Sequence, residues 1–448
     1  MPLWRCDLND CDRPSVRTSG ECVLCDRHLC AEHLGPKIHT CPPWEDADAY
    51  DPLAGEAERR ELTKLIETIN TPALEARASQ LRQGIPCSVS PRRYDKATRS
   101  SVMGGMNYHI EVRFHDGVVW LARVRSEVAT LMFLQDETDV PAPKVYDYAL
   151  EGPHNPVGVG FILVEKIPGK SLRWSVANQE QRTKVMDQLA DTFIELSKHP
   201  FDRLGSLDTP GGSHVGAFAR ESLTTFVQWE MRAIGPLSSL EEYHRTSIQL
   251  ILDLILQDEM YSQRPVDAYL IHRHLLDLVS RVLPPAHSAD DDDDDNNNNG
   301  NFYLKHADDK GDHIMVDDEY NITAIIDWEW AHTAVPAHAF NSPIGLLPVA
   351  EFYKGNNTLG DDEAVFARLL EAKGRRDLAR FVWDGRLQHR FAFCCGYDLA
   401  DWDGFLGLFR GLRDAVGVDG DLGWDEWRSV ALERYEEDAG LQSLLARG

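Results

Sequence analysis

The sequence predicts an α+β protein with two lobes, one rich in strands and one mainly helical, behind a small metal-binding module. Residues 86–167 alternate between apolar and polar positions as strands do, and from residue 175 onward apolar residues recur at helical spacing. Acidic residues stand at both ends of a strand–turn–strand segment near residue 320. Six of the nine cysteines fall within the first 41 residues, beside two histidines.

Composition limits the classes of function. A chain of 448 residues should bury at least one large core. It has no run of about 18 apolar residues, so no membrane span is expected. The N-terminus lacks the apolar core of a signal peptide, which predicts a protein of the cytoplasm or nucleus. With 73 acidic and 46 basic residues the net charge is −27, which argues against a broad nucleic-acid-binding surface.

Residues 1–45 contain a cluster of soft metal ligands. In chain order these are Cys6, Cys11, Cys22, Cys25, Cys30, His33, His39 and Cys41. Eight such ligands are enough for two tetrahedral zinc ions. The segment has few apolar side chains, so metal binding must supply its folding free energy. Disulfide pairing is the alternative, and an intracellular compartment disfavours it.

The order and spacing of these ligands resemble the AN-one-type zinc finger, in which alternate ligand pairs hold two structural zinc ions. The resemblance implies that one zinc is bound by Cys6, Cys11, Cys30 and His33, and the other by Cys22, Cys25, His39 and Cys41. His28 lies outside the pattern and is expected at the surface. Fingers of this type are generally protein-interaction modules, so the resemblance also implies a protein partner.

Residues 46–85 are expected to form a linker and helices. Pro42-Pro43 and the acidic stretch through Asp51 have the composition of a linker. From about residue 56 to residue 83 the pattern is helical, and Pro72 interrupts it. We therefore expect two short helices here. The apolar positions at helical spacing are Leu62, Leu65, Ile66 and Ile69.

Residues 86–167 should form the strand-rich lobe. Residues 108–114 and 118–124 read as strands joined by a turn, and residues 161–164 read as a buried strand. Gly104 and Gly105 precede the first of them. A glycine pair lets backbone amides approach a phosphate closely, although a plain hairpin is the alternative.

Residues 168–448 should form the helical lobe. Amphipathic patterns predict helices near residues 186–194, 248–256 and 269–282. Residues 288–300 include six consecutive aspartates, which cannot pack together, so we expect a disordered acidic insert. A calcium site is the alternative, but the run lacks spaced ligands. Cys394 and Cys395 are expected to be buried thiols.

The strand–turn–strand segment is the most informative part of the chain. Asp308 lies in a loop, residues 314–316 form a short apolar strand, and residues 322–326 form the returning strand before Asp327. A hairpin of this length could bring the two carboxylates close together. Two adjacent carboxylates repel each other unless a cation or a reacting hydroxyl group lies between them.

This segment reads His306-Ala307-Asp308, four residues, His313, a strand, then residues 326–329, Ile-Asp-Trp-Glu. It resembles the catalytic segment of aminoglycoside phosphotransferase and choline kinase-like enzymes, which share the protein-kinase-like fold. The resemblance implies that Asp308 orients the acceptor hydroxyl and takes its proton. It also implies that Asp327 holds magnesium at the phosphates of ATP and that His306 braces the loop. His313 replaces the family's metal-binding Asn, and imidazole is a poor magnesium ligand.

The resemblance extends to the strand-rich lobe. Arg123 stands where the family has a basic phosphate-binding residue, with Glu127 as its ion-pair partner. An ordinary exposed salt bridge is the alternative for this pair. The Gly104–Gly105 turn would contact the phosphates. Backbone groups of Glu165 to Ile167, between the lobes, would hydrogen-bond adenine.

Two functional hypotheses follow. The combination of finger and catalytic segment is similar to fungal phosphotransferase-domain proteins, which implies an ATP- and magnesium-dependent phosphotransferase acting on a hydroxyl group of an unknown small molecule. The alternative is a catalytically attenuated pseudokinase or adaptor that is recruited through its finger. His313 and the short connector between Arg123 and Glu127 favour the alternative. A third interpretation is that His313 binds a transition metal.

Overall fold

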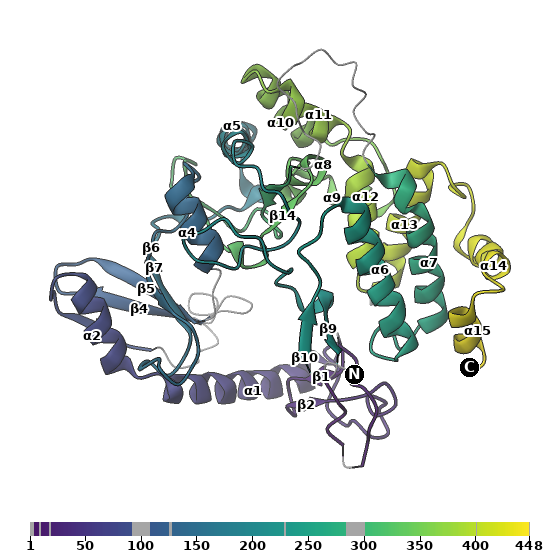
Figure 1. The fold of residues 1–448 in the computed structure, drawn as a ribbon, viewed down its shortest axis with the longest axis horizontal. Helices are drawn as coiled ribbons and strands as arrows, with labels where there is room; N and C mark the ends of the chain where they lie inside the picture. The colour runs from purple at the N-terminus through teal and green to yellow at the C-terminus, as the bar shows by residue number, and fades with distance from the viewer. Residues whose placement is uncertain are drawn as a thin grey trace.

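The computed structural model describes residues 4–8, 10–17, 19–91, 108–124, 128–227, 230–283, 301–399 and 401–447. Gly104, Gly105, Glu127 and the acidic insert 288–300 lie outside the described residues. The fold is α+β, with a strand-rich N-lobe, a larger helical C-lobe and a small N-terminal module below them (Figure 1). This confirms the predicted fold class. No described helix is long and apolar enough to cross a membrane.

The N-terminal module has very little regular structure. Its two short strands, β1 (Glu21–Cys22) and β2 (Arg27–His28), pair antiparallel. Its small core consists of buried Cys6, Leu29 and Cys30 with a few partly buried neighbours. Trp4 and Val23, two of the apolar residues available for a core, are instead 46% and 52% exposed. Apolar burial alone therefore cannot hold this module together.

Two helices connect the module to the N-lobe. Helix α1 (Ala47–Thr68) begins at Asp46, whose side chain accepts a hydrogen bond from the Ala49 amide. The acidic stretch from residue 47 to residue 51 is therefore helical and not linker. Helix α2 (Thr71–Leu81) has Pro72 in its first turn, where its missing amide costs nothing. The predicted division into two helices is confirmed.

The N-lobe is a five-stranded antiparallel sheet in the order β3-β4-β5-β7-β6. Helix α2 packs on β3 and β4, and α4 (Val128–Glu137) lies between β6 and the C-lobe. The buried face of the sheet forms one core with Leu62, Ile69 and Leu74 of the helical segment. The strands are β3 (Cys87–Val89), β4 (Tyr108–Phe114), β5 (Val119–Val124), β6 (Val145–Ala149) and β7 (Phe161–Glu165).

A short linker after β7 carries the chain into the C-lobe. Strand β8 (Lys170–Ser171) pairs with β12 of the C-lobe. Gly169 has a φ of +109°, and a Cβ at this position would lie 2.4 Å from the carbonyl oxygen of Val316. Only glycine permits both this backbone conformation and this close approach. The linker is therefore held tightly against the strand that follows the candidate catalytic loop.

The central part of the C-lobe carries that loop. Strands β12 (Ile314–Val316) and β13 (Ile322–Ile325) form the predicted hairpin, and β11 (Tyr303–Lys305) pairs with β14 (His332–Ala334). One core joins this part to α4 and to the β6–β7 edge of the N-lobe. Its helices are α5 (Gln179–Leu196), α8 (Pro336–Ala339), α10 (Asp361–Ala372) and α11 (Arg376–Trp383). Short 3-10 turns cover Trp174–Val176, Glu221–Leu223, Trp328–Trp330 and Ile344–Leu346.

A second core defines what we call the helical subdomain, at the right of Figure 1. Its helices are α6 (Leu240–Leu256), α7 (Pro265–Val282), α9 (Val349–Tyr353), α12 (Arg386–Gly396), α13 (Trp402–Val416), α14 (Trp424–Arg434) and α15 (Ala439–Leu445). Cys394 is buried here with the aromatic side chains, as predicted, whereas Cys395 is only partly buried. A hairpin of β9 (Thr224–Val227) and β10 (Glu230–Ala233) lies between this subdomain and the N-terminal module (Figure 1).

Candidate functional site

Asp308 lies in the loop before β12, at the solvent-facing side of the C-lobe core. Its carboxylate is 44% exposed, and the Lys310 ammonium lies 3.0 Å from Oδ2. This hydrogen bond with Asp308 raises the pKa of Lys310. A carboxylate in this position is open to an incoming hydroxyl group and has a cation next to it. Sequence reasoning did not identify Lys310.

Asp327 follows β13 and contacts the N-lobe. The guanidinium of Arg123, on β5, forms an ion pair with the Asp327 carboxylate and lies 3.8 Å from Glu329. The backbone of Asp327 is left-handed, with a φ of 70°. Non-glycine residues rarely adopt this conformation, and functional sites are enriched in it. The pair joins the two residues that the resemblance assigns to phosphate and metal binding.

His306 connects the two ends of the hairpin. Its Nδ1 accepts the backbone amide of Asp308 at 3.2 Å, so its Nε2 carries the proton and donates to the Ile326 carbonyl at 2.9 Å. Burial lowers the pKa of His306, which keeps the ring neutral and this tautomer in place. The imidazole thereby holds the backbone before Asp327 at a fixed position relative to the backbone of Asp308.

His313 is turned into the protein. Its Nδ1 accepts the Gly311 amide at 3.3 Å, and its ring lies 4.2 Å from the His306 ring between centroids. Burial lowers the pKa of His313 to about 3, so the ring is neutral at physiological pH. Both rings line a small cavity of about 40 Å³ beneath the loop. His313, which stands where the family has Asn, therefore packs against His306, the residue that holds the loop in place.

Asp309 differs from its neighbour Asp308 in burial. Its side chain accepts the Ile344 amide at 3.1 Å and lies 3.4 Å from the Lys305 ammonium. Burial raises the pKa of the Asp309 carboxyl, but Lys305 and the Ile344 amide outweigh it and hold that pKa below its ordinary value. Asp309 therefore anchors the loop from inside.

The N-lobe side of the site has two further features. His109, paired with Arg123 across β4 and β5, has its pKa lowered to about 4 by burial and by the Arg123 charge. It is neutral at physiological pH and was not identified from the sequence. The amide of Glu165 donates to the Lys144 carbonyl at 2.8 Å. Any adenine contact would therefore use other backbone groups of the segment from Glu165 to Ile167.

The eight ligands of the N-terminal module gather into two groups. Within each group all ligand atoms lie within 4.8 Å of one another. The groups are Cys6, Cys11, Cys30, His33 and Cys22, Cys25, His39, Cys41, the same sets that the resemblance implies. Ligand separations include 3.2 Å for Cys6 Sγ to His33 Nδ1 and 4.0 Å for Cys11 Sγ to Cys30 Sγ. Zn–S bonds of about 2.3 Å give a tetrahedral edge of about 3.8 Å, so the residues fit zinc.

The charges within these groups also fit a cation. Burial and the neighbouring thiols Cys22 and Cys25 raise the pKa of Cys41 to about 12. In this second group, thiols held this close resist ionisation unless a cation lies between them. In the first group, burial raises the pKa of Cys6, but hydrogen bonds led by that with His33 outweigh burial and lower this pKa to about 7, which favours the thiolate that a metal binds. His28 belongs to neither group and stacks on Trp4 instead. Among the described residues, Asp308, His313 and Asp327 form no comparable ligand group.

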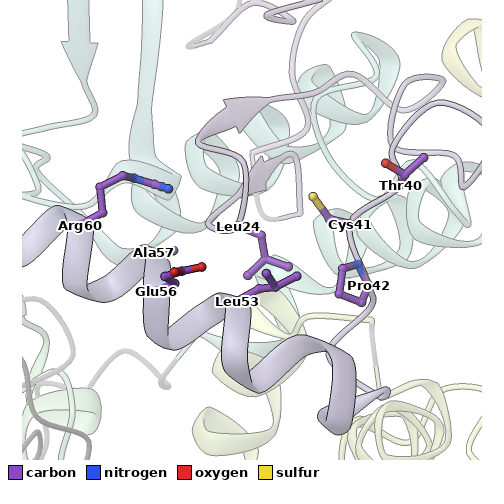
Figure 2. A pocket seen from close by; sticks show the side chains of 8 residues that line it. All are labelled: Leu24, Thr40, Cys41, Pro42, Leu53, Glu56, Ala57 and Arg60. Carbon is purple, nitrogen blue, oxygen red and sulfur yellow. The ribbon is translucent and has the colours of Figure 1, made fainter.

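A groove of about 410 Å³ opens between the module and α1. Figure 2 shows Leu24 of the module facing Leu53 of the helix, with Cys41 and Pro42 at one end and Arg60 at the other. Several apolar side chains of this region are exposed, including Trp44 at 72% and Ile38 at 47%. Sequence reasoning did not predict this groove, because its two walls are separated in the chain.

Curated relatives of this chain match it over only part of their own length. The chain is 35% identical over 121 residues to Altered inheritance of mitochondria protein 9, mitochondrial, of Komagataella phaffii, covering 25% of this chain and 19% of that protein. It is 30% identical over 155 residues to a subtelomeric hrmA-associated cluster protein of Aspergillus fumigatus, covering 32% and 29%. It is 24% identical over 274 residues to Clavilactone A biosynthesis cluster protein Y of Ampulloclitocybe clavipes, covering 54% and 64%. The chain thus spans less than two thirds of each relative.

Solved structures and a family model complete the comparison. Aminoglycoside phosphotransferase APH(4)-Ia, in complex with AMP-PNP and hygromycin B, is 14% identical with a TM-score of 0.42, covering 77% of this chain and 98% of that one. An aminoglycoside 2′-phosphotransferase-IIIa variant with GDP is 16% identical with a TM-score of 0.41, covering 82% and 97%. The model described as Phosphotransferase enzyme family matches residues 109–342, slightly more than half of the chain. The chain therefore belongs to the phosphotransferase enzyme family.

Proposed function

We propose that this protein is an ATP- and magnesium-dependent phosphotransferase that transfers a phosphoryl group to a hydroxyl group of a small molecule. One observation carries the proposal. The hairpin presents Asp308 at one end and Asp327 at the other, and Arg123 of the N-lobe reaches across to Asp327. An exposed carboxylate, a candidate metal ligand and a candidate phosphate-binding cation would thus lie near the contact between the lobes.

The residues of the hairpin would act by positioning and by charge. Asp308 would orient the acceptor hydroxyl and accept its proton as the oxygen attacks. Lys310, 3.0 Å from Asp308, would supply positive charge near the transferred group. His306 would act as a positioning residue, because its two hydrogen bonds fix the loop against the strand end.

Asp327 has the chemistry of a magnesium ligand, an ionised carboxylate oxygen. Magnesium bound there would neutralise charge on the phosphates of ATP. Arg123 would contribute the second cation, moving from its pair with Asp327 to the phosphate oxygens. The glycine pair Gly104–Gly105 and the backbone between Glu165 and Ile167 would complete the nucleotide site as the resemblance implies. Glu127 would pair with Arg123 in that arrangement.

The N-terminal module would bind two structural zinc ions. The support is the gathering of eight sulfur and imidazole ligands into two sets of four in a segment with almost no apolar core. Elemental analysis of the purified protein should give two zinc ions per chain. A disulfide-linked, zinc-free module would contradict this assignment.

The acceptor can be found by a screen for ADP release. Purified, zinc-loaded protein would be mixed with ATP, magnesium and a panel of hydroxylated metabolites that includes sugars, amino alcohols and choline-like alcohols. Acceptor-dependent ADP release, absent without magnesium, would support the proposal. A melting temperature that ATP and magnesium fail to raise would remove its basis, because a binding site for them must stabilise the folded state.

A second candidate function is an attenuated enzyme that acts as an adaptor. The position of His313 favours it. The imidazole lies against His306 and accepts the Gly311 amide, so the family's second metal ligand is missing on this side. Under this function the protein would bind nucleotide without turnover, and its module would recruit a protein partner. The groove beside Leu24 and Leu53 is a candidate surface for that partner (Figure 2).

A further inference from the structure

The N-terminal module is fastened to the C-lobe by a buried ion pair. Arg17 Nε donates to Glu259 Oε2 at 2.9 Å, and the Arg17 backbone amide donates to the Glu259 carbonyl at 2.8 Å. Arg17 Nη1 also donates to the Thr224 carbonyl at 2.5 Å. The two charged side chains are only 3% and 1% exposed. A buried pair with several hydrogen bonds fixes an orientation, which an exposed pair does not.

The two ends of this contact belong to different parts of the molecule. Glu259 lies between α6 and α7 in the helical subdomain, and Thr224 begins β9. Arg17 lies between Cys11 of the first ligand group and Cys22 of the second. The neighbouring Val16 amide donates to the carbonyl of Leu29, next to Cys30, so the position of Arg17 depends on the fold of the module.

Helix α1 connects the same module to the N-lobe. The Lys64 ammonium lies 3.8 Å from the Asp26 carboxylate of the module, and the groove of Figure 2 separates the first half of the helix from Leu24. The end of the helix that carries Lys64 is also packed into the N-lobe. Leu62 is buried in the N-lobe core, and a Cβ on Gly158 would lie 2.5 Å from the carbonyl oxygen of Thr68.

This arrangement gives the lobes a further connection, beyond the linker and the shared core. Helix α1 has 22 residues and is therefore about 33 Å long. Figure 1 shows it running along the lower edge of the molecule, from the module beneath β9 and β10 to α2 beside the N-lobe sheet. The chain itself joins the lobes through the short linker between β7 and β8, where Gly169 packs on Val316.

We infer that the N-terminal module and α1 form a metal-dependent brace that holds the N-lobe at a fixed distance from the helical subdomain. The brace restrains the contact at which Arg123 of the N-lobe meets Asp327 of the C-lobe. Loss of the Arg17–Glu259 contact, or of the metal that folds the module, detaches α1 from the helical subdomain. The consequence for nucleotide binding rests on the proposed function, whereas the mechanical link does not.

The test measures the distance between the lobes in the full-length, zinc-loaded protein. Spin labels are introduced as noncanonical amino acids at two exposed sites, Val118 in the N-lobe and Val430 on α14. Double electron–electron resonance then compares Arg17→Met and Glu259→Gln with the unaltered chain. Arg13→Met is the matched control, because Arg13 pairs with Glu32 inside the module and both side chains are more than half exposed.

Both brace variants should show a broader and shifted distance distribution, and Arg13→Met should keep the original one. Zinc removal by a chelator should reproduce the effect of Arg17→Met. If only about a tenth of the variant molecules keep the lobe spacing of the unaltered protein, the apparent Kd for ADP rises roughly tenfold. If Arg17→Met loses zinc, the result for Glu259→Gln decides whether the contact restrains the lobes, because this variant alters only the C-lobe side of the Arg17–Glu259 contact. An unchanged distribution in Glu259→Gln, or after zinc removal, would overturn the brace.

The distance measurement requires no turnover. A protein that fails to bind ADP but whose lobes move in the brace variants would contradict the proposed function and leave the brace in place. A protein that phosphorylates an acceptor normally, with lobes that stay fixed in both variants, would support the proposed function and contradict the brace.

Discussion

Replacing Asp308 and its neighbour Asp309 one at a time should separate catalysis from stability. In Asp308→Asn the lost interaction is an ion pair with Lys310 between side chains that are 44% and 57% exposed. Such pairs contribute about 0–1 kcal/mol to folding. Loss of a general base costs roughly 10²- to 10⁴-fold in rate. At 1.36 kcal/mol per factor of ten, the barrier rises by about 2.7–5.4 kcal/mol. The rate should therefore fall far more than the stability.

Asp309→Asn should give the opposite result. The Asp309 side chain is 9% exposed, accepts the Ile344 amide and faces Lys305, whose side chain is 20% exposed. Asparagine can still accept the amide hydrogen bond, but it leaves the Lys305 charge without its carboxylate. Weakening such a buried, charged hydrogen bond costs roughly 1–3 kcal/mol. The folded fraction of this variant should retain most of its activity.

Three measurements on each variant decide the matter. Steady-state ADP release with the acceptor found in the screen gives kcat, calorimetry gives the Kd for ADP, and thermal melting gives the change in stability. Asp308→Asn should keep the Kd and the Tm while kcat falls. The assignment of Asp308 would be refuted if that variant kept more than about a tenth of the rate. It would also fail if Asp308→Asn destabilised the protein more than Asp309→Asn does.

Three further predictions concern the same site and the buried histidines. His313→Asn should raise phosphotransfer if the native site is attenuated for want of an oxygen ligand, as measured by ADP release. Lowering the pH from 7.5 to 5.5 should destabilise the protein, because burial lowers the pKa of His389 to about 3 and the unfolded chain takes up protons below about pH 6.5. Over this range the loss should be about 1.4 kcal/mol for each histidine that stays neutral in the folded state, because pH 5.5 lies about one unit below the unfolded pKa. His389→Gln should reduce the slope of Tm against pH. Magnesium alone should leave the Tm unchanged, whereas magnesium with ADP should raise it.

Each of these three predictions would be contradicted by a specific result. An active native enzyme whose rate is unaffected in His313→Asn would show that Asp327 and water suffice for the metal. A Tm that is equally steep with pH in His389→Gln would show that His389 is not protonated preferentially in the unfolded chain. A Tm that rises with magnesium alone would show a metal site assembled before the nucleotide arrives.

Local patterns in the sequence were enough for most of the fold. The strand from Tyr108 to Phe114 and the hairpin around β12 and β13 follow from alternation and turn residues, which act over a few neighbours. The two ligand groups of the module follow from spacing together with a family resemblance. The start of α1 was missed, because acidic residues that suggest a linker also suit the first turn of a helix.

Side-chain pairing across the molecule could not be predicted. Arg123 contacts Asp327, 204 positions away, and Arg17 contacts Glu259, 242 positions away. The sequence around Arg123 or Arg17 does not indicate which residue it contacts, because such contacts are set by the packing of whole lobes. The inward orientation of His313 was missed for a related reason. Its partner His306 is close in sequence, but only the folded hairpin brings the two rings together.

The charges of the candidate site bear on how magnesium would enter it. Asp308, Asp327 and Glu329 contribute three negative charges, and Lys310 and Arg123 contribute two positive charges, so the five groups sum to −1. The Asp327 carboxylate already has a guanidinium partner, and magnesium binds tightly only where several oxygen ligands surround it. Triphosphate oxygens would provide those ligands and at the same time attract Arg123 away from Asp327. Metal and nucleotide are therefore expected to bind together, with Arg123 exchanging a carboxylate for a phosphate as they do.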